Sequence, residues 1–299
     1  MVVRSAIKIL KGTGPLEFLN ALSDALNSKV LTRRLSQRTG NSSISDAGLY
    51  PAFCLLASRN DRVFDRFRRS LIYRIILEHV NIDQGHEYLK EIEQGGRMLD
   101  QLRPLLESDT IGGPIKYRYG SYGLVSPSTL RYIKVATDLG NLFGPLDSLK
   151  IAEIGVGYGG QCRVVCALWP VKSYILFDIP EVLALSRRFL EESDVESSVI
   201  SERDGRNPHT DDVDLIISNY AFSELRREIQ EQYFEQIIKH TSRGYVTYNH
   251  LTPPEFQSLT AYEFAERIPG ARVLPERPKT HDGNVIVVWG LNAKDSPAS

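Results

Sequence analysis

The stretch KIAEIGVGYGGQC, residues 150–162, decides the fold of this chain. An apolar run that contains Glu153 leads into Gly155, Gly157 and Gly159, which alternate with other residues. Such a run indicates a buried strand, and the glycines permit a tight turn and close approach of backbone N–H groups to a ligand. The spacing differs from G-x-G-x-x-G, which places a pyrophosphate over a helix N-terminus. The stretch therefore predicts a strand, a ligand-binding loop and a helix.

Apolar runs alternate with helical patterns from this stretch to the end of the chain. The predicted strands cover residues 150–155, 173–179, 197–201, 212–220, 244–249, 271–276 and 284–290. Strands that alternate with helices pair in parallel, so we expect an α/β fold with a seven-stranded, doubly wound, Rossmann-like sheet. The last two strands have no helix between them, which predicts a hairpin and one antiparallel edge strand.

Residues 1–110 have a different pattern and form a predicted helical N-terminal extension. Apolar residues recur at spacings of three and four in DRVFDRFRRSLIYRIILEHV, residues 61–80, which predicts one long helix. We expect this extension to act as a lid, a dimerisation element or both. Its apolar face offers a surface for a homodimer through Phe64, Phe67, Leu71 and Ile75.

Composition limits the partners and the compartment. The chain has 36 basic and 37 acidic residues, so it lacks the basic excess typical of nucleic-acid and membrane-surface proteins. The cluster Arg66, Arg68 and Arg69 is interpreted as a solvated helix face. Three cysteines are few, and an odd number of them does not fit a disulfide framework. No apolar run reaches transmembrane length. We expect a cytoplasmic protein with no nucleic-acid partner.

Acidic and polar residues follow the predicted strands where a doubly wound sheet binds its ligand. Glu153 repels a pyrophosphate and favours an ammonium group, and S-adenosylmethionine carries an ammonium and a sulfonium but no phosphate. Asp178 can accept hydrogen bonds from both ribose hydroxyls, or cap the next helix. Asp204 can accept from an adenine amino group, or form a simple Asp-Gly turn. The predicted cofactor-binding residues are Glu153, Gly155, Gly157, Gly159, Asp178, Ile179, Asp204, Gly205 and Asn219.

Four segments carry a resemblance to a known family. Residues 127–290 resemble a class I S-adenosylmethionine-dependent methyltransferase, a fold whose last strand is inserted antiparallel. The segments SPSTLRYIKV, EIGVGYGGQC, FDIPEVL and ISNYAFSEL resemble a family of sugar O-methyltransferases. The resemblance implies a methyltransferase domain over residues 111–299 and transfer of a methyl group to a hydroxyl of a sugar, sugar-containing small molecule or glycan. Another small-molecule oxygen or nitrogen acceptor, and a non-catalytic binding module, stay open as alternatives.

The general base has no settled position. Plant-type O-methyltransferases have a His-Asp pair after the fourth strand, whereas this chain has Ser223-Glu224. Because a sugar hydroxyl is a poor acid, a base within hydrogen-bond reach helps the reaction. The candidates are His250, His281 and Glu224. The alternatives are a loop cap for His250 and an exposed turn for His281.

Aromatic and amide side chains are candidates for the acceptor site. Tyr119 and Tyr122 can stack on a sugar ring, or belong to a cluster that holds the helical half to the sheet. Tyr220 follows the fourth strand, and Asn284 precedes the last one. We expect no required metal, because the acidic run Asp211, Asp212 and Asp214 precedes its strand, at the end of the sheet away from the chemistry.

Overall fold

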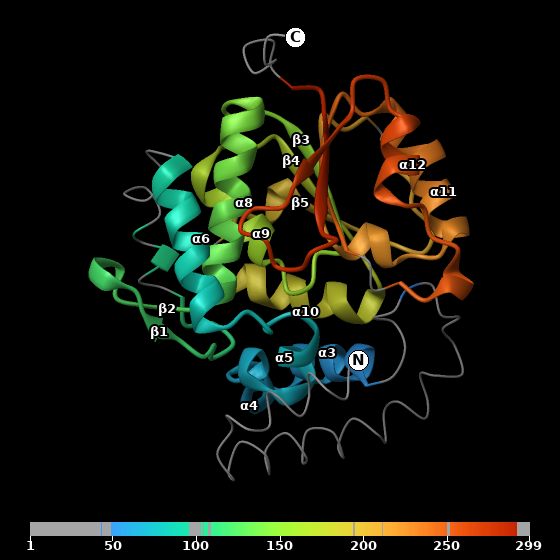
Figure 1. The fold of residues 1–299 in the computed structure, drawn as a ribbon. Coiled ribbons are helices and arrows are strands. Elements are labelled where there is room, and N and C mark those ends of the chain that lie inside the picture. Colours follow the sequence, from blue (N-terminus) through green and yellow to red (C-terminus); the bar gives the residue numbers. More distant parts are fainter. Residues whose placement is uncertain are drawn as a thin grey trace.

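The predicted sheet is present in the computed structural model of the chain (Figure 1). The structure describes residues 43, 49–95, 103, 105–106, 109–193, 195–210, 212–249 and 252–291. The strand order is β5-β4-β3-β6-β7-β9-β8. The strands are β3 (Lys150–Ile154), β4 (Ser173–Asp178), β5 (Ile200–Asp204), β6 (Leu215–Asn219), β7 (Arg243–Tyr248), β8 (Arg272–Pro275) and β9 (Val285–Trp289). Six of them overlap the runs expected from the sequence over their whole length or nearly so. The exception is β5, which shares only two residues with the run predicted over 197–201, because Ser197–Val199 forms a 3₁₀ turn.

The C-terminal hairpin differs from the prediction in one respect. β3 to β7 pair in parallel, whereas β9 runs antiparallel to both β7 and β8. The antiparallel strand is therefore inserted inside the sheet, and β8 forms the edge. The predicted hairpin is confirmed, and so is the inserted antiparallel last strand that the resemblance implied; only the placing of the antiparallel strand at the edge, from the hairpin argument alone, is corrected. The absence of a helix between the last two strands predicts that β8 and β9 pair antiparallel with each other. It does not predict which of them lies next to β7.

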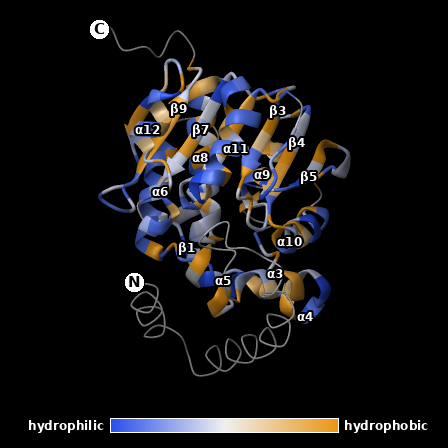
Figure 2. Cartoon of the chain, turned by 90° about the vertical axis from the view of Figure 1, so that its right-hand side faces the viewer, coloured by the Kyte–Doolittle hydropathy of each residue, from blue (hydrophilic) through white to orange (hydrophobic). Residues whose placement is uncertain are grey.

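Helices cover both faces of the sheet because successive strand residues point to opposite sides. In β3, Ile151 packs with the cluster that includes α8 (Pro127–Phe143), α9 (Gly160–Leu168) and α10 (Pro180–Glu191). Its neighbour Ala152 packs on the other face, in the cluster that includes α11 (Arg227–Gln236) and α12 (Ala261–Glu266). Figure 2 shows the hydrophobic residues of β3 and β4 between these layers. This sandwich leaves the carboxyl ends of the strands as the place for a site.

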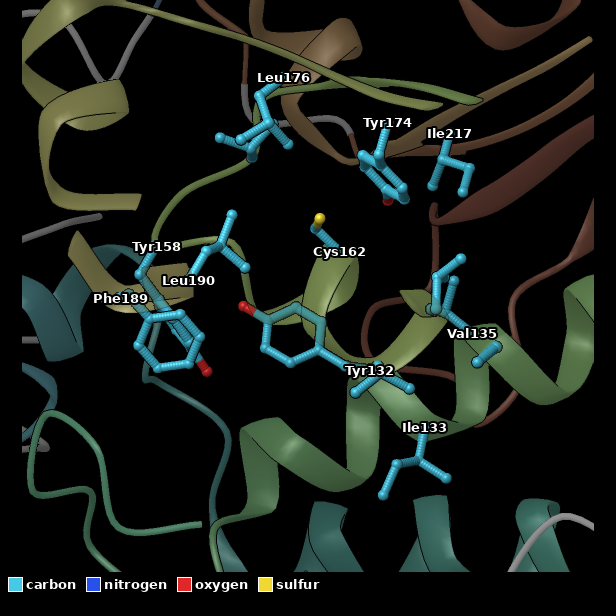
Figure 3. Packing of buried hydrophobic residues seen from close by; sticks show 14 of the residues in the cluster. Tyr132, Ile133, Val135, Tyr158, Cys162, Tyr174, Leu176, Phe189, Leu190 and Ile217 are labelled. Atoms are coloured by element: carbon cyan, nitrogen blue, oxygen red, sulfur yellow. The ribbon is translucent and has the colours of Figure 1, made fainter. Parts of the chain in front are cut away.

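The first core cluster is rich in aromatic rings. Tyr158, from the glycine loop, packs edge-to-face on Tyr132 of α8 and Phe189 of α10, with ring centroids 5.8 and 4.7 Å apart (Figure 3). Cys162 lies in the same cluster, and its Sγ is 3.9 Å from that of Cys166. Cys162 is buried in the core, and Cys166 is half-buried against it. The loop is thus anchored to two helices through one tyrosine.

The described N-terminal helices pack into this same core. They are α3 (Tyr50–Arg59), α4 (Asp61–Phe64), α5 (Leu71–Ile76) and α6 (Ile82–Gly95). The single helix predicted over residues 61–80 is wrong, because Ser70 ends one segment and caps the next through its side chain. Phe64 and Phe67 are at most 1% exposed. They belong to the core, so these two residues cannot form the predicted homodimer surface; the homodimer itself stays a prediction.

The arginine cluster is also different from its interpretation. Arg68 is 1% exposed, and its guanidinium binds Glu78 at 2.6 Å and Asp109 at 2.8 Å. It also donates to the hydroxyls of Ser126 and Thr129 at the start of α8. The solvated-face interpretation is therefore wrong for Arg68. This network ties the N-terminal helices to α8, the helix that borders the candidate site.

Apolar residues recur at helical spacing over residues 253–268, but the α-helix there covers only Ala261–Glu266. A 3₁₀ turn covers Pro254–Phe256, Gln257 is left-handed, and α12 begins after Thr260. Thr260 and Glu263 form a reciprocal capping box, which gives α12 a defined start. No helix among the described residues is long and apolar enough to span a membrane.

Candidate functional site

The glycine loop between β3 and α9 has the backbone that the sequence predicts. Gly155, Gly157 and Gly159 have φ values of 77°, 55° and 88°, in the left-handed region that favours glycine. A Cβ on Gly155 would lie 1.9 Å from the Cβ of Ala221. Gly155 therefore allows the segment after β6 to lie directly against the loop, and this contact brings two strand ends together.

Asp178 at the end of β4 faces this loop. Its carboxylate accepts hydrogen bonds from the N–H of Gly157 at 3.1 Å and of Ile179 at 2.8 Å. Gly205, after β5, donates its N–H to the carbonyl of Asp178 at 2.8 Å. The structure thus brings the predicted residues Gly157, Asp178, Ile179 and Gly205 into one cluster.

Asp204 pairs with Asp178 in the β4–β5 register but binds locally. Its carboxylate accepts from Arg206, with Nη2 at 2.7 Å and the backbone N–H at 3.0 Å. Partial burial raises the pKa of Asp204, but the bonds from Arg206 outweigh it, so the pKa lies below its ordinary value. The Asp-Gly turn that the sequence left open is present, and an adenine contact would compete with Arg206.

Glu153 is not at the open side of the loop. It is 2% exposed and accepts a hydrogen bond from the hydroxyl of Tyr174 at 2.7 Å. Burial raises the pKa of Glu153 to about 8, against the lowering effect of that hydrogen bond. A carboxyl that is protonated at neutral pH offers no negative charge to an ammonium group. The geometry therefore gives Glu153 a place beneath the loop.

The end of β6 carries a side-chain oxygen, Oδ1 of Asn219, that is better placed than the carboxyl of Glu153 to accept a hydrogen bond from a ligand. Asn219 approaches Gln161 of α9, with Nδ2 3.5 Å from Oε1, and its own Oδ1 is buried without a hydrogen-bond partner among the described residues. Tyr220 has a φ of 69°, which is rare for a bulky residue. Strain of this kind concentrates at functional sites. Asn219 and Tyr220 therefore lie between the glycine loop and a cavity that they line.

A small cavity opens beside Asn219 and Tyr220. Its volume of about 20 Å³ is room for about one water molecule. The lining residues come from α6, α8, the ends of β6 and β7, and the segment around β8 and β9: Tyr88, Arg131, Lys134, Val135, Asn219, Tyr220, Tyr245, Thr247, Glu276, Arg277 and Ile286. Tyr88 and Glu276 were not predicted from the sequence. The acid that ends the run ARVLPE was the available signal for Glu276.

Glu276 is a buried carboxylate within this wall. It is 6% exposed and accepts from the hydroxyl of Tyr220, and from the N–H and hydroxyl of Thr280 at 3.0 and 2.5 Å. Asn284, another predicted residue, reaches this group only through Thr280, to which its Nδ2 donates at 2.9 Å. A carboxylate with this many donors is held firmly beside Tyr220.

The predicted base candidates lie in different surroundings. His250 lies outside the described residues, so its role stays a prediction. His281 is exposed in the β8–β9 loop, where Nδ1 accepts from the N–H of Gly283 at 3.3 Å. Glu224 accepts from Nδ2 of Asn249 at 2.7 Å, in a network with Ser223. Neither His281 nor Glu224 lines the cavity described above.

The two tyrosines predicted to stack on a sugar ring hold the hairpin of β1 (Tyr117–Arg118) and β2 (Leu124–Val125) to α6. Tyr119 is fully buried, and its hydroxyl donates to the carbonyl of Ile82 at 3.3 Å. Tyr122 donates to Glu93 at 3.3 Å. The packing alternative left open by the sequence describes both contacts, and neither residue lines the cavity.

The N-terminal helices reach the glycine loop directly. A Cβ on Gly157 would lie 2.8 Å from Cδ1 of Leu77, the residue after α5. The carbonyl of Leu77 accepts from Nη2 of Arg131 at 3.2 Å. Leu77 therefore packs against the loop at Gly157. Within the described part of the chain, no group of three or more His, Cys, Asp or Glu could hold a metal ion.

Comparisons with known proteins find distant structural likeness. No family model matches this sequence, and no curated protein matches it. An rRNA methylase from Streptococcus thermophilus is 14% identical over 54% of this chain and 98% of that one, with a TM-score of 0.40. An assigned O-methyltransferase from Nostoc punctiforme is 15% identical over 70% of this chain and 72% of that one, with a TM-score of 0.39. These likenesses are too distant to carry an argument about function.

The strand order is the one that the resemblance implies. The sheet has a parallel core β5-β4-β3-β6-β7, with β9 inserted antiparallel beside β7. The fold implied by the resemblance is therefore confirmed, and the methyltransferase activity and its cofactor, S-adenosylmethionine, belong to the proposal that follows. The narrower resemblance to sugar O-methyltransferases belongs there too.

Proposed function

We propose that this chain is an S-adenosylmethionine-dependent O-methyltransferase whose cofactor lies on the loop between β3 and α9. The observation that supports this most is the convergence of Gly157, Asp178 and Asn219 at the carboxyl ends of β3, β4 and β6. Bound there, S-adenosylmethionine supplies a methyl carbon activated by its sulfonium. The protein then has to bind, align and deprotonate the acceptor.

The donor and acceptor groups of the site fit this cofactor. The carboxylate of Asp178 can accept from the two ribose hydroxyls in a bidentate manner. The unpartnered Oδ1 of Asn219 can accept from the ammonium group, a role that the buried Glu153 does not fill. Leu77 packs against the loop at Gly157, and binding of the cofactor there is proposed to move it away. This movement is how the proposed lid would act.

The cavity beside Asn219 is the proposed place of the acceptor. Methyl transfer forms a bond from the acceptor oxygen to the methyl carbon and breaks the bond from that carbon to sulfur, and the hydroxyl proton leaves. The Tyr220–Glu276 pair provides a carboxylate beside this position, so we add Glu276 to His250, His281 and Glu224 as a candidate base. Because the cavity holds about one water molecule, the acceptor must enlarge it on binding.

A methyl-transfer assay tests the proposal. Labelled S-adenosylmethionine is offered with neutral sugars, nucleotide sugars, amines and RNA, to wild type and to Asp178→Asn. The proposal expects label on a sugar hydroxyl and loss of transfer in the variant. Label on an amine or on RNA would retain the methyltransferase and reject the sugar. Cofactor binding without transfer to any acceptor class would favour the non-catalytic module.

A further inference from the structure

One buried cation in the cavity wall has no carboxylate partner among the described residues. Arg131 is 6% exposed, yet among the described residues no carboxylate oxygen lies within 4.0 Å of its guanidinium. Its Nη2 donates to the carbonyl of Leu77, and its guanidinium carbon lies 5.3 Å from the ring centre of Tyr132. Its Nε is buried without a hydrogen-bond partner in the same part of the chain. A buried charge is normally paired, so this arginine is an exception.

Two other buried cations of the chain have carboxylate partners. Arg68, which is buried to a similar degree, binds two carboxylates. Lys134 lies one turn from Arg131 on α8 and lines the same cavity, and its Nζ binds Asp138 at 2.6 Å. Arg68 and Lys134 are thus paired with carboxylates of the chain, whereas the guanidinium of Arg131 is available to a partner from outside it.

The remaining charges of the wall favour an anion. The exposed Arg277 lies at the cavity. Glu276 is the carboxylate among the lining residues, and its oxygens already accept from Tyr220 and Thr280. The carboxylate of Glu276 therefore already accepts hydrogen bonds from Tyr220 and Thr280, whereas Nε of Arg131 has no hydrogen-bond partner among the described residues. A guanidinium fork matches the planar oxygens of a carboxylate or the oxygens of a phosphate.

We propose that the acceptor carries an anionic group, a carboxylate or a phosphate, and that Arg131 binds this group while the acceptor hydroxyl lies beside Asn219 and Tyr220. This inference rests on the proposed function, and it narrows the acceptor from sugars in general to acidic ones such as uronic acids or sugar phosphates. Arg131 is then a specificity-determining residue: it fixes which molecule enters, and its Nη2–Leu77 contact links acceptor binding to the segment that packs against the glycine loop.

The test measures thermal unfolding of the full chain in sodium phosphate and in sodium acetate, against sodium chloride at equal ionic strength. At ten times the dissociation constant, either anion should raise the Tm of wild type by about 2–5 °C. The same anion should not raise the Tm of Arg131→Met. A response to phosphate alone identifies a phosphorylated acceptor, and a response to acetate alone identifies a carboxylated one. No anion-specific shift in wild type, or an equal shift in the variant, would overturn the inference.

The Tm of the variants without added anion gives a second, independent result. A residue kept for a ligand costs stability when the ligand is absent, so Arg131→Met should keep or raise the Tm. Arg68→Met, the matched control, should lower it by about 10 °C because it leaves two carboxylates unpaired. An equally large loss in Arg131→Met would mean that its partners are internal, and the inference fails. S-adenosylhomocysteine should still stabilise Arg131→Met, so failure of the proposed function would be seen separately.

Discussion

The substitution Glu153→Gln tests how the protonation of one buried carboxyl, beneath the glycine loop, makes the stability of the protein depend on pH. Folding raises the pKa of Glu153 from 4.5 to about 8, so between these values the folded state keeps a proton that the unfolded state has released. Stability therefore falls as pH rises through this window, by up to about 1.4 kcal/mol per pH unit for this group. From pH 5 to pH 8 the upper limit is about 4 kcal/mol. Glutamine keeps an acceptor for Tyr174 and cannot ionise.

Urea unfolding at pH 5, 6.5 and 8 measures the effect. The free energy of unfolding of Glu153→Gln minus that of wild type should increase steadily with pH, because all other titrating groups cancel in the difference. Glu266→Gln, at an exposed position of α12, serves as the matched control, and its difference should stay flat. A flat difference for Glu153→Gln would show that Glu153 ionises normally, and the reasoning about its burial would be refuted.

Three further substitutions test the packing around the site. Gly155→Ala should destabilise the protein more than Gly270→Ala, because both have φ above 70° but only Gly155 would place its Cβ 1.9 Å from another atom; equal losses in urea unfolding would contradict the contact. Leu77→Ala should tighten S-adenosylhomocysteine binding by up to about tenfold, since less buried apolar surface has to be displaced, and unchanged affinity relative to the exposed Leu124→Ala would argue against a cover. Arg68→Met should lower the free energy of unfolding by about 3–5 kcal/mol, and a loss below about 1 kcal/mol in urea unfolding would contradict the network.

The fold was predictable because the decisive signals are local. Each buried strand is a short apolar run, and the left-handed glycines of the loop have no substitute among the other residues. Pairing order is non-local, so the pattern of apolar runs could not show that β9 lies inside the sheet; only the resemblance to a known family implied it. Helix breaks at Ser70 and Gln257 were missed because the apolar spacing continues across them, while a cap or a left-handed residue interrupts the backbone.

The site was predictable only in part, for a related reason. Asp178, Gly157 and Asn219 converge because parallel strands end at one edge, which the strand order dictates. Whether a charged residue is buried depends on packing between distant segments, so the burial of Glu153, Arg68 and Arg131 could not be predicted from the sequence. Glu153 lies beside Tyr174, Arg68 binds Asp109, and Arg131 faces a cavity whose walls come from several elements.

A calorimetric titration with S-adenosylhomocysteine tests the central claim most directly. Wild type should bind, and Asp178→Asn should bind about 10–100-fold more weakly, because one or two charge-assisted hydrogen bonds are lost. Glu202 lies on the neighbouring strand β5, and its carboxylate binds Arg187 of α10. The control variant Glu202→Gln should bind S-adenosylhomocysteine as wild type does. No binding by wild type, or equal binding by Asp178→Asn, would contradict the assignment of the glycine loop and Asp178 as the cofactor site.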